Sequence, residues 1–133
     1  MSPETQTLTF SQHIQAPPEQ VYRAFTNATA LQEWLANMAT VAPRPAGRLY
    51  LWWNAGYYTS GEYSTVEPDK LAFTWHGRGD PGATRVQVTL TPKDGGTLVA
   101  LEHSGIGAGK EWAGAAEEIK KGWKSGLENL ASV

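Results

Sequence analysis

The sequence contains no cysteine among its 133 residues. This absence excludes disulfide bonds, thiolate metal sites and thiol catalysis. The three histidines, His13, His76 and His103, show neither paired spacing nor an HExxH pattern. Since a protein metal site needs several ligands brought together, we expect no metal and no cofactor.

Neither basic nor acidic residues predominate, and the sequence also lacks a long apolar segment. Eleven basic and 13 acidic residues give a formal net charge of −2, which offers no electrostatic footprint for nucleic acid or an anionic membrane. No apolar run approaches the roughly 20 residues that cross a bilayer. The first ten residues have neither a basic n-region nor an apolar h-region. We therefore expect a cytoplasmic protein with no nucleic-acid or membrane partner, forming one domain over residues 1–133.

Aromatic side chains, in contrast, are abundant. The chain has six tryptophans, five tyrosines and three phenylalanines. Large flat side chains on several elements leave irregular spaces and offer apolar ligands broad surfaces. This composition favours an internal cavity, and a core in which the rings simply pack against one another is the alternative.

Alternation of apolar and polar residues predicts a series of strands with short turns. The residues from Thr40 to Pro45 allow at most a short edge strand because of their prolines, and Gly61 is a possible β-bulge. Short connections between alternating strands predict one antiparallel meander with a single buried face. The predicted strands are Thr5–Ile14, Gly47–Trp53, Tyr57–Val66, Leu71–His76, Arg85–Leu90 and Thr97–His103.

Helical spacing appears in two parts of the chain. Pro17-Pro18-Glu19 suits the start of a short helix, and Asn27 or Thr29 can cap a second one. A long C-terminal helix is predicted by an apolar stripe at i, i+3/i+4 spacing, and the pattern still continues at Val133. Its members are Trp112, Ala116, Ile119, Trp123, Leu127 and Leu130.

This order of elements resembles the α+β helix-grip fold of START-like (SRPBCC) and birch-pollen-allergen-like proteins. More narrowly, it is similar to the family related to the C-terminal domain of the activator of heat-shock-protein-90 ATPase. The resemblance implies a cavity between a curved antiparallel sheet and the long C-terminal helix, as used for lipids, sterols and polyketides. It is carried by Ala16–Glu19, Val21–Phe25, Leu31–Trp34, Gly47, Ser60–Tyr63, Pro68–Trp75 and Glu102–Gly105.

Two glycine-rich segments match phosphate-binding patterns only superficially. Gly77 to Gly82 fits G-x-G-x-x-G, but a strand rather than a helix is predicted after it, so we interpret it as a hairpin loop. Ser104 to Lys110 lacks the first glycine of a phosphate loop, and Glu111 replaces its Ser or Thr. We interpret this segment as a mobile connector near the mouth of the cavity.

The predicted cavity lining combines the aromatic and apolar residues of the inner faces with a few polar groups. His103 is either a core histidine with satisfied ring nitrogens or a ligand contact, and Glu62 faces it if Gly61 bends the strand. Tyr57 and Tyr58 suit either surface packing or the rim of the cavity. The predicted lining is Trp34, Leu51, Trp53, Tyr58, Glu62, Phe73, Trp75, Val88, Leu101, His103, Trp112, Ile119 and Trp123.

The sequence therefore favours a binding module, monomeric or homodimeric, for a hydrophobic or amphipathic small molecule that is lipid-like, aromatic or polyketide-like. No catalytic residue is assigned. One alternative is a polyketide cyclase or aromatase using His103 and Glu62 as an acid–base pair. The other is a co-chaperone-like interaction module, although no second domain that would grip a chaperone is visible. Outward-facing Trp52 is compatible with dimerisation through that face.

Overall fold

The computed structural model describes residues 5–132; residues 1–4 and Val133 lie outside the described part, and with them the ends of the predicted domain. Its elements are β1 (Thr5–Ile14), α1 (Pro18–Thr26), α2 (Ala28–Trp34), β2 (Met38–Val41), β3 (Arg48–Trp52), β4 (Tyr58–Glu67), β5 (Lys70–Gly77), β6 (Thr84–Lys93), β7 (Gly96–Gly107), the 3₁₀ helix η1 (Lys110–Trp112) and α3 (Ala113–Ser132).

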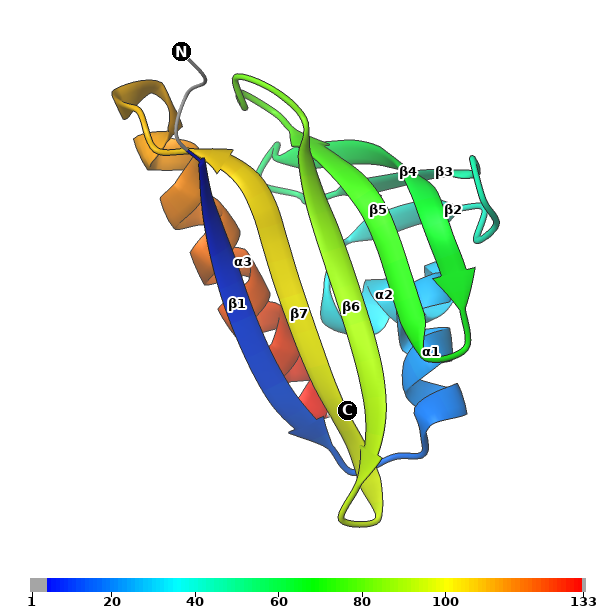
Figure 1. The fold of residues 1–133 in the computed structure, drawn as a ribbon. Coiled ribbons are helices and arrows are strands. Elements are labelled where there is room, and N and C mark those ends of the chain that lie inside the picture. The colour runs from blue at the N-terminus through cyan, green and yellow to red at the C-terminus, as the bar shows by residue number, and fades with distance from the viewer. Residues whose placement is uncertain (1–4, 133) are drawn as a thin grey trace.

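Within residues 5–132, seven strands form one antiparallel sheet in the order β1-β7-β6-β5-β4-β3-β2. The meander from β2 to β7 follows the chain, and β1 joins it by pairing with β7. The sheet is curved, with α3 lying along one face and α1 and α2 at one end (Figure 1). The predicted α+β helix-grip arrangement is thereby confirmed. A short edge strand is present as expected, but β2 occupies Met38–Val41 and so begins before the predicted segment Thr40–Pro45 and ends within it.

Register between neighbouring strands places apolar residues of the same inner face side by side. Val88 of β6 lies opposite Leu71 of β5 and Leu101 of β7. These three side chains are at most 1% exposed. Full burial of a Val or Leu side chain contributes about 1.5–3 kcal/mol, so this central row is a main source of stability.

The bulge in β4 lies at a different position from the predicted one. The register between β4 and β5 shifts between Tyr63 and Thr65, whereas Gly61 precedes the shift. Gly61 has another role: a Cβ at this position would lie 1.8 Å from the Thr74 carbonyl oxygen. The glycine therefore permits close approach of the β5 backbone.

Most of the glycine-rich segments adopt the turn or loop structure that their residues favour. Asp94 and Gly95 adopt φ values of 50° and 77° in the β6–β7 hairpin, which Asp-Gly tolerates at low cost. The Gly77–Gly82 segment is a hairpin loop, as predicted, and the Gly77 N–H donates to Asp80 Oδ2 at 2.8 Å. The predicted connector from Ser104 is wrong in its first half, because β7 extends to Gly107 and Ile106 is fully buried.

The helices cover the inner face and one end of the sheet. Asn27, rather than Thr29, caps α2, since its Oδ1 accepts the Ala30 N–H at 3.0 Å. No helix within residues 5–132 has both the length and the hydropathy needed to span a membrane. The predicted stripe lies on α3 except for its first member, Trp112, which is in the 3₁₀ helix η1. The buried residues of α3 are Ile119, Trp123, Gly126, Leu127 and Leu130.

Candidate ligand pocket

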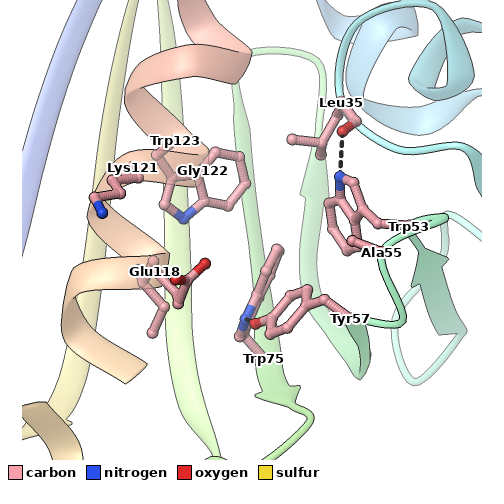
Figure 2. A pocket seen from close by; sticks show the side chains of 10 residues that line it. Leu35, Trp53, Ala55, Tyr57, Trp75, Glu118, Lys121, Gly122 and Trp123 are labelled. Carbon is pink, nitrogen blue, oxygen red and sulfur yellow. Dashed lines mark hydrogen bonds between the residues drawn. The ribbon is translucent and has the colours of Figure 1, made fainter. Parts of the chain in front are cut away.

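A pocket of about 310 Å³ opens between α3 and the β3–β4 connection, beside the end of α2 (Figure 2). The helix side and the sheet side both contribute aromatic rings, because the stripe of α3 crosses the inner face here. Its lining is Leu35, Trp53, Ala55, Tyr57, Trp75, Glu118, Ile119, Lys121, Gly122 and Trp123.

Each indole N–H in the lining is bonded to the protein itself. Trp53 Nε1 donates to the Leu35 carbonyl at 2.7 Å, and Trp75 Nε1 donates to the Tyr57 hydroxyl at 3.1 Å. Trp123 Nε1 donates to His103 Nδ1 at 3.0 Å. The rings thus present carbon surface to the pocket, with their polar edges occupied elsewhere.

The pocket has a nearly closed floor and more open walls. Trp75 and Trp123 are only 4% and 2% exposed, whereas Trp53 and Tyr57 are partly exposed. Trp75 and Trp123 lie 5.2 Å apart between ring centroids, so side-chain packing fills the sheet–helix interface beneath the pocket. The hollow therefore lies above this packed interface, beside the β3–β4 connection, whereas the resemblance implied a cavity between the sheet and the long helix.

His103 lies under this floor, fully buried, with both ring nitrogens hydrogen bonded. Because Nδ1 accepts the Trp123 N–H, the ring proton must sit on Nε2, which donates to Thr84 Oγ1 at 2.6 Å. The Thr84 hydroxyl in turn donates to the Trp75 carbonyl at 2.9 Å. Burial lowers the pKa of His103 from 6.5 to about 4, which keeps the imidazole neutral.

Polar groups are found at the rim of the pocket. Burial raises the pKa of the Tyr57 hydroxyl to about 12, so it stays protonated at neutral pH. Glu118 and Lys121 lie on exposed positions of α3. Figure 2 shows the Glu118 carboxylate directed toward the pocket and the Lys121 ammonium on the other side of the helix.

The structure brings four of the predicted lining residues to this pocket: Trp53, Trp75, Ile119 and Trp123. Others are part of the packed core. Trp34 contacts Phe25 with ring centroids 4.9 Å apart, and Trp112 is partly buried against Gly107. The remaining core members of the predicted set are Leu51, Phe73, Val88 and Leu101.

Two predicted residues lie on the outer face instead. Tyr58 is 40% exposed and stacks on Tyr50, with ring centroids 6.1 Å apart. Glu62 is exposed and is followed by the inward, buried Tyr63. The suggested pairing of Glu62 with His103 is therefore wrong, because Gly61 does not reverse the alternation of β4. An acid–base pair for cyclase chemistry is not assembled.

Six lining residues were not in the predicted set: Leu35, Ala55, Tyr57, Glu118, Lys121 and Gly122. Tyr57 follows from alternation, since Tyr63, Gly61 and Thr59 face inward and the next residue on that face is Tyr57. The α3 residues flank the apolar stripe, so their helical position was the available signal. No sequence pattern places Leu35 or Ala55 here.

Other hollows have a different character. A larger one, of about 500 Å³, lies between α1, the β4–β5 turn and β6, with Tyr22 as its aromatic ring. We favour the pocket beside Trp75 despite its smaller volume, because several rings converge there. No group of three or more His, Cys, Asp or Glu that could hold a metal occurs within the described residues.

A family model described as "Activator of Hsp90 ATPase homolog 1-like protein" matches residues 15–133. The human protein named Activator of 90 kDa heat shock protein ATPase homolog 1 is 27% identical over 120 residues, which cover 88% of this chain and 33% of that protein. This chain thus spans about a third of the length of the curated relatives it matches.

Solved structures with the same fold cover nearly the whole chain. Protein MLL2253 from Mesorhizobium loti is 30% identical with a TM-score of 0.82, over 96% of this chain and 95% of that one. An HSP90 activator from Plasmodium falciparum is 26% identical with a TM-score of 0.78, over 93% of this chain and 92% of that one. The similarity therefore extends over all of the elements that form the pocket.

Proposed function

Because this chain belongs to the Activator of Hsp90 ATPase homolog 1-like family, we propose that it is a module that binds a small apolar, aromatic or amphipathic molecule in the pocket beside Trp75. The family and fold expected from the sequence are confirmed. The binding function is our proposal from the chemistry of the pocket lining.

The observation that carries the proposal is a concave group of rings whose indole N–H groups are already bonded. Trp53, Trp75 and Trp123 use these donors within the protein, so they offer a ligand ring surface rather than polar edges. Moving apolar ligand surface from water onto such rings is favourable by about 25 cal/mol per Å², before ordering costs. The Tyr57 hydroxyl adds one polar group that can orient the ligand.

The volume limits the ligand size. About 310 Å³ is at the lower end of the roughly 300–1,000 Å³ typical of small-molecule sites. A compact aromatic or short amphipathic ligand fits this volume better than a long lipid. We therefore expect larger polyketide-like ligands to bind only if α3 moves away from the sheet.

Gly122 provides a direct test, because a Cβ at this lining position would meet no atom within 4 Å. The variant Gly122→Leu should place its side chain in the pocket without disturbing the core. We expect it to weaken binding of the neutral probe N-phenyl-1-naphthylamine by at least about tenfold, which corresponds to a loss of roughly 1.4 kcal/mol of binding free energy. Probe fluorescence measures the affinity.

Gly114→Leu is the matched control, since Gly114 is also an exposed α3 glycine with open space but does not line the pocket. It should bind the probe as the wild type does. Equal affinity of both variants, or no binding by the wild type, would contradict the proposal. Native mass spectrometry of the protein purified from its own cells then identifies a retained ligand.

A second candidate function, binding to a chaperone, is favoured by the similarity to the Plasmodium HSP90 activator. The outer face of β2, β3 and β4 has a surface suited to a protein partner. Met38, Trp52 and Tyr58 are neighbours across these strands, and Tyr50 stacks on Tyr58. Met38, Tyr50 and Tyr58 are 58%, 42% and 40% exposed.

The two candidate functions use different surfaces, the pocket and the outer face of β2, β3 and β4, so variants of each surface distinguish them. If the chain stimulates the ATPase of an Hsp90-type chaperone through this face, the double variant Met38→Ser, Tyr58→Ser should abolish stimulation and Gly122→Leu should preserve it. Absence of stimulation by the wild-type protein, together with no capture in a chaperone pull-down, would exclude this second function.

A further inference from the structure

The rings of the pocket are inclined to one another rather than stacked. Trp53 is tilted by 56° to Tyr57 and by 51° to Trp75, and Trp75 is tilted by 52° to Trp123. Aromatic rings carry negative potential on their faces and positive potential on their edges. Because the indole N–H groups are bonded within the protein, they do not repel a cation, and a positive group placed over a ring face would be attracted to it.

The formal charge that faces the pocket is also negative. The Glu118 carboxylate is directed into it from α3, whereas the Lys121 ammonium is directed away (Figure 2). The nearby Arg78 does not line the pocket, and its Nη1 donates to the Gly56 carbonyl at 2.9 Å. An anionic ligand would therefore meet the Glu118 carboxylate, while the ammonium of the lining residue Lys121 is turned away from it.

The Tyr57 hydroxyl, on the opposite wall of the pocket, is also affected by nearby negative charge. Burial is the main cause that raises the pKa of its hydroxyl to about 12; the hydrogen bond from Trp75 lowers the pKa, and the charges of Asp80 and Glu118 raise it further. Asp80, whose carboxylate accepts the Gly77 N–H, does not line the pocket, so Glu118 is the carboxylate in the lining.

We propose that the pocket selects an organic cation, a protonated or quaternary amine on an apolar body, with its charged group between Glu118 and Tyr57 and its body on Trp53 and Trp75. This inference rests on the proposed function, because it names the ligand class of the same pocket. Glu118 is then the residue that determines charge specificity, while the rings supply apolar contact for any ligand.

A matched series of three probes tests the inference: 2-phenylethylammonium, neutral 2-phenylethanol and anionic phenylacetate. They share an aromatic body and differ mainly in charge at neutral pH. Binding is followed by NMR through the indole N–H signals of Trp53, Trp75 and Trp123, at pH 7 and low salt. We expect the cation to bind about tenfold tighter than the alcohol, and the anion to bind weakest.

Glu118→Gln removes the charge from the rim, and Glu117→Gln removes the same charge from a neighbouring exposed position outside the pocket. The preference for the cation should fall to within about threefold in Glu118→Gln and persist in Glu117→Gln. Both side chains are exposed, so neither substitution threatens the fold. Glu118→Lys should reverse the order of cation and anion.

The outcomes separate this inference from the function on which it rests. Equal binding of cation and alcohol, abolished by Gly122→Leu, would overturn the charge selection and leave small-molecule binding intact. A preference for the cation that is unchanged in Glu118→Gln would overturn the role of Glu118. Absence of binding by all three probes and by the neutral naphthylamine would overturn both proposals.

Discussion

His103 joins the long helix to the sheet by hydrogen bonds at both ring nitrogens. Nδ1 accepts from Trp123 of α3, and Nε2 donates to Thr84 of β6, which donates onward to the Trp75 carbonyl. Protonation would place a second N–H against the Trp123 N–H and bring an unpaired charge into the core. The histidine therefore positions the two rings that form the floor of the pocket, and only as a neutral group.

This arrangement predicts that stability falls with acidification. The pKa of His103 is about 4 in the folded protein against 6.5 for an ordinary histidine. Between these values the unfolded chain binds a proton that the folded protein excludes, so the stabilisation is complete above pH 6.5 and is lost as the pH falls toward 4. As the pH falls from above 6.5 to about 4, His103 should lower the unfolding free energy by about 3 kcal/mol. Urea titrations at several pH values measure this change.

The variant His103→Asn isolates this contribution. Asn does not titrate and keeps an acceptor near the position of Nδ1, so its unfolding free energy should depend less on pH between 4 and 6.5. His76→Asn, at an exposed position, should retain the wild-type dependence. Parallel pH profiles for the wild type and His103→Asn would disprove the assignment.

Within α3, three glycines have different surroundings. A Cβ at Gly114 or Gly122 would meet nothing within 4 Å. A Cβ at Gly126 would lie 3.1 Å from Leu35 Cδ1 and 3.5 Å from the Trp34 ring. Close approach of α3 to α2 thus depends on Gly126, whereas Gly122 leaves open space at the pocket.

Substitution by alanine should separate these roles. Gly122→Ala should stabilise the protein by about 1 kcal/mol, because alanine favours the helix and has room for its methyl group. Gly126→Ala should gain less or be destabilising, since its methyl group must displace Leu35. Urea unfolding measures both, and equal stabilisation by the two substitutions would show that the helix does not pack this closely.

As a whole, the molecule is a curved sheet whose inner face is covered by α3, with α1 and α2 at one end (Figure 1). The strands β5, β6 and β7 carry fully buried residues such as Leu71, Val86 and Val99. The pocket lies where α3 passes the β3–β4 connection, away from these central rows. The proposed ligand would therefore enter without opening the most stable part of the fold.

Hydrogen exchange should follow this distribution. We expect slow exchange in β6 and in β7 through Gly107, because Ile106 is fully buried and pairing with β1 continues to Gly107, although pairing with β6 ends at Ser104. Ala108 and Gly109, which are exposed and outside the strand, should exchange quickly. Mass spectrometry of peptides covering 104–107 and 108–111 distinguishes these segments. Fast exchange in the peptide covering 104–107 would show that this segment is the mobile connector expected from the sequence.

Local sequence patterns were sufficient to predict most helices and strands and the faces that they bury. Alternation at i, i+2 placed Leu49, Leu51 and Trp53 on one face of a strand, and i, i+3/i+4 spacing identified the stripe of α3. Asp94-Gly95 specified a tight hairpin through its backbone preferences. These features depend on neighbours within a few residues, so the sequence contains them directly.

Which of these faces meet, and how completely they pack, depends on contacts between residues that are far apart in the sequence. His103 finds its partners 19 and 20 residues away, and the pocket combines residues from Leu35 to Trp123. Their meeting depends on sheet curvature and on how closely α3 approaches, which local periodicity does not encode. Alternation places Tyr57 and Tyr58 on opposite faces at the start of β4, but only the approach of α3 makes the face of Tyr57 a wall of the pocket.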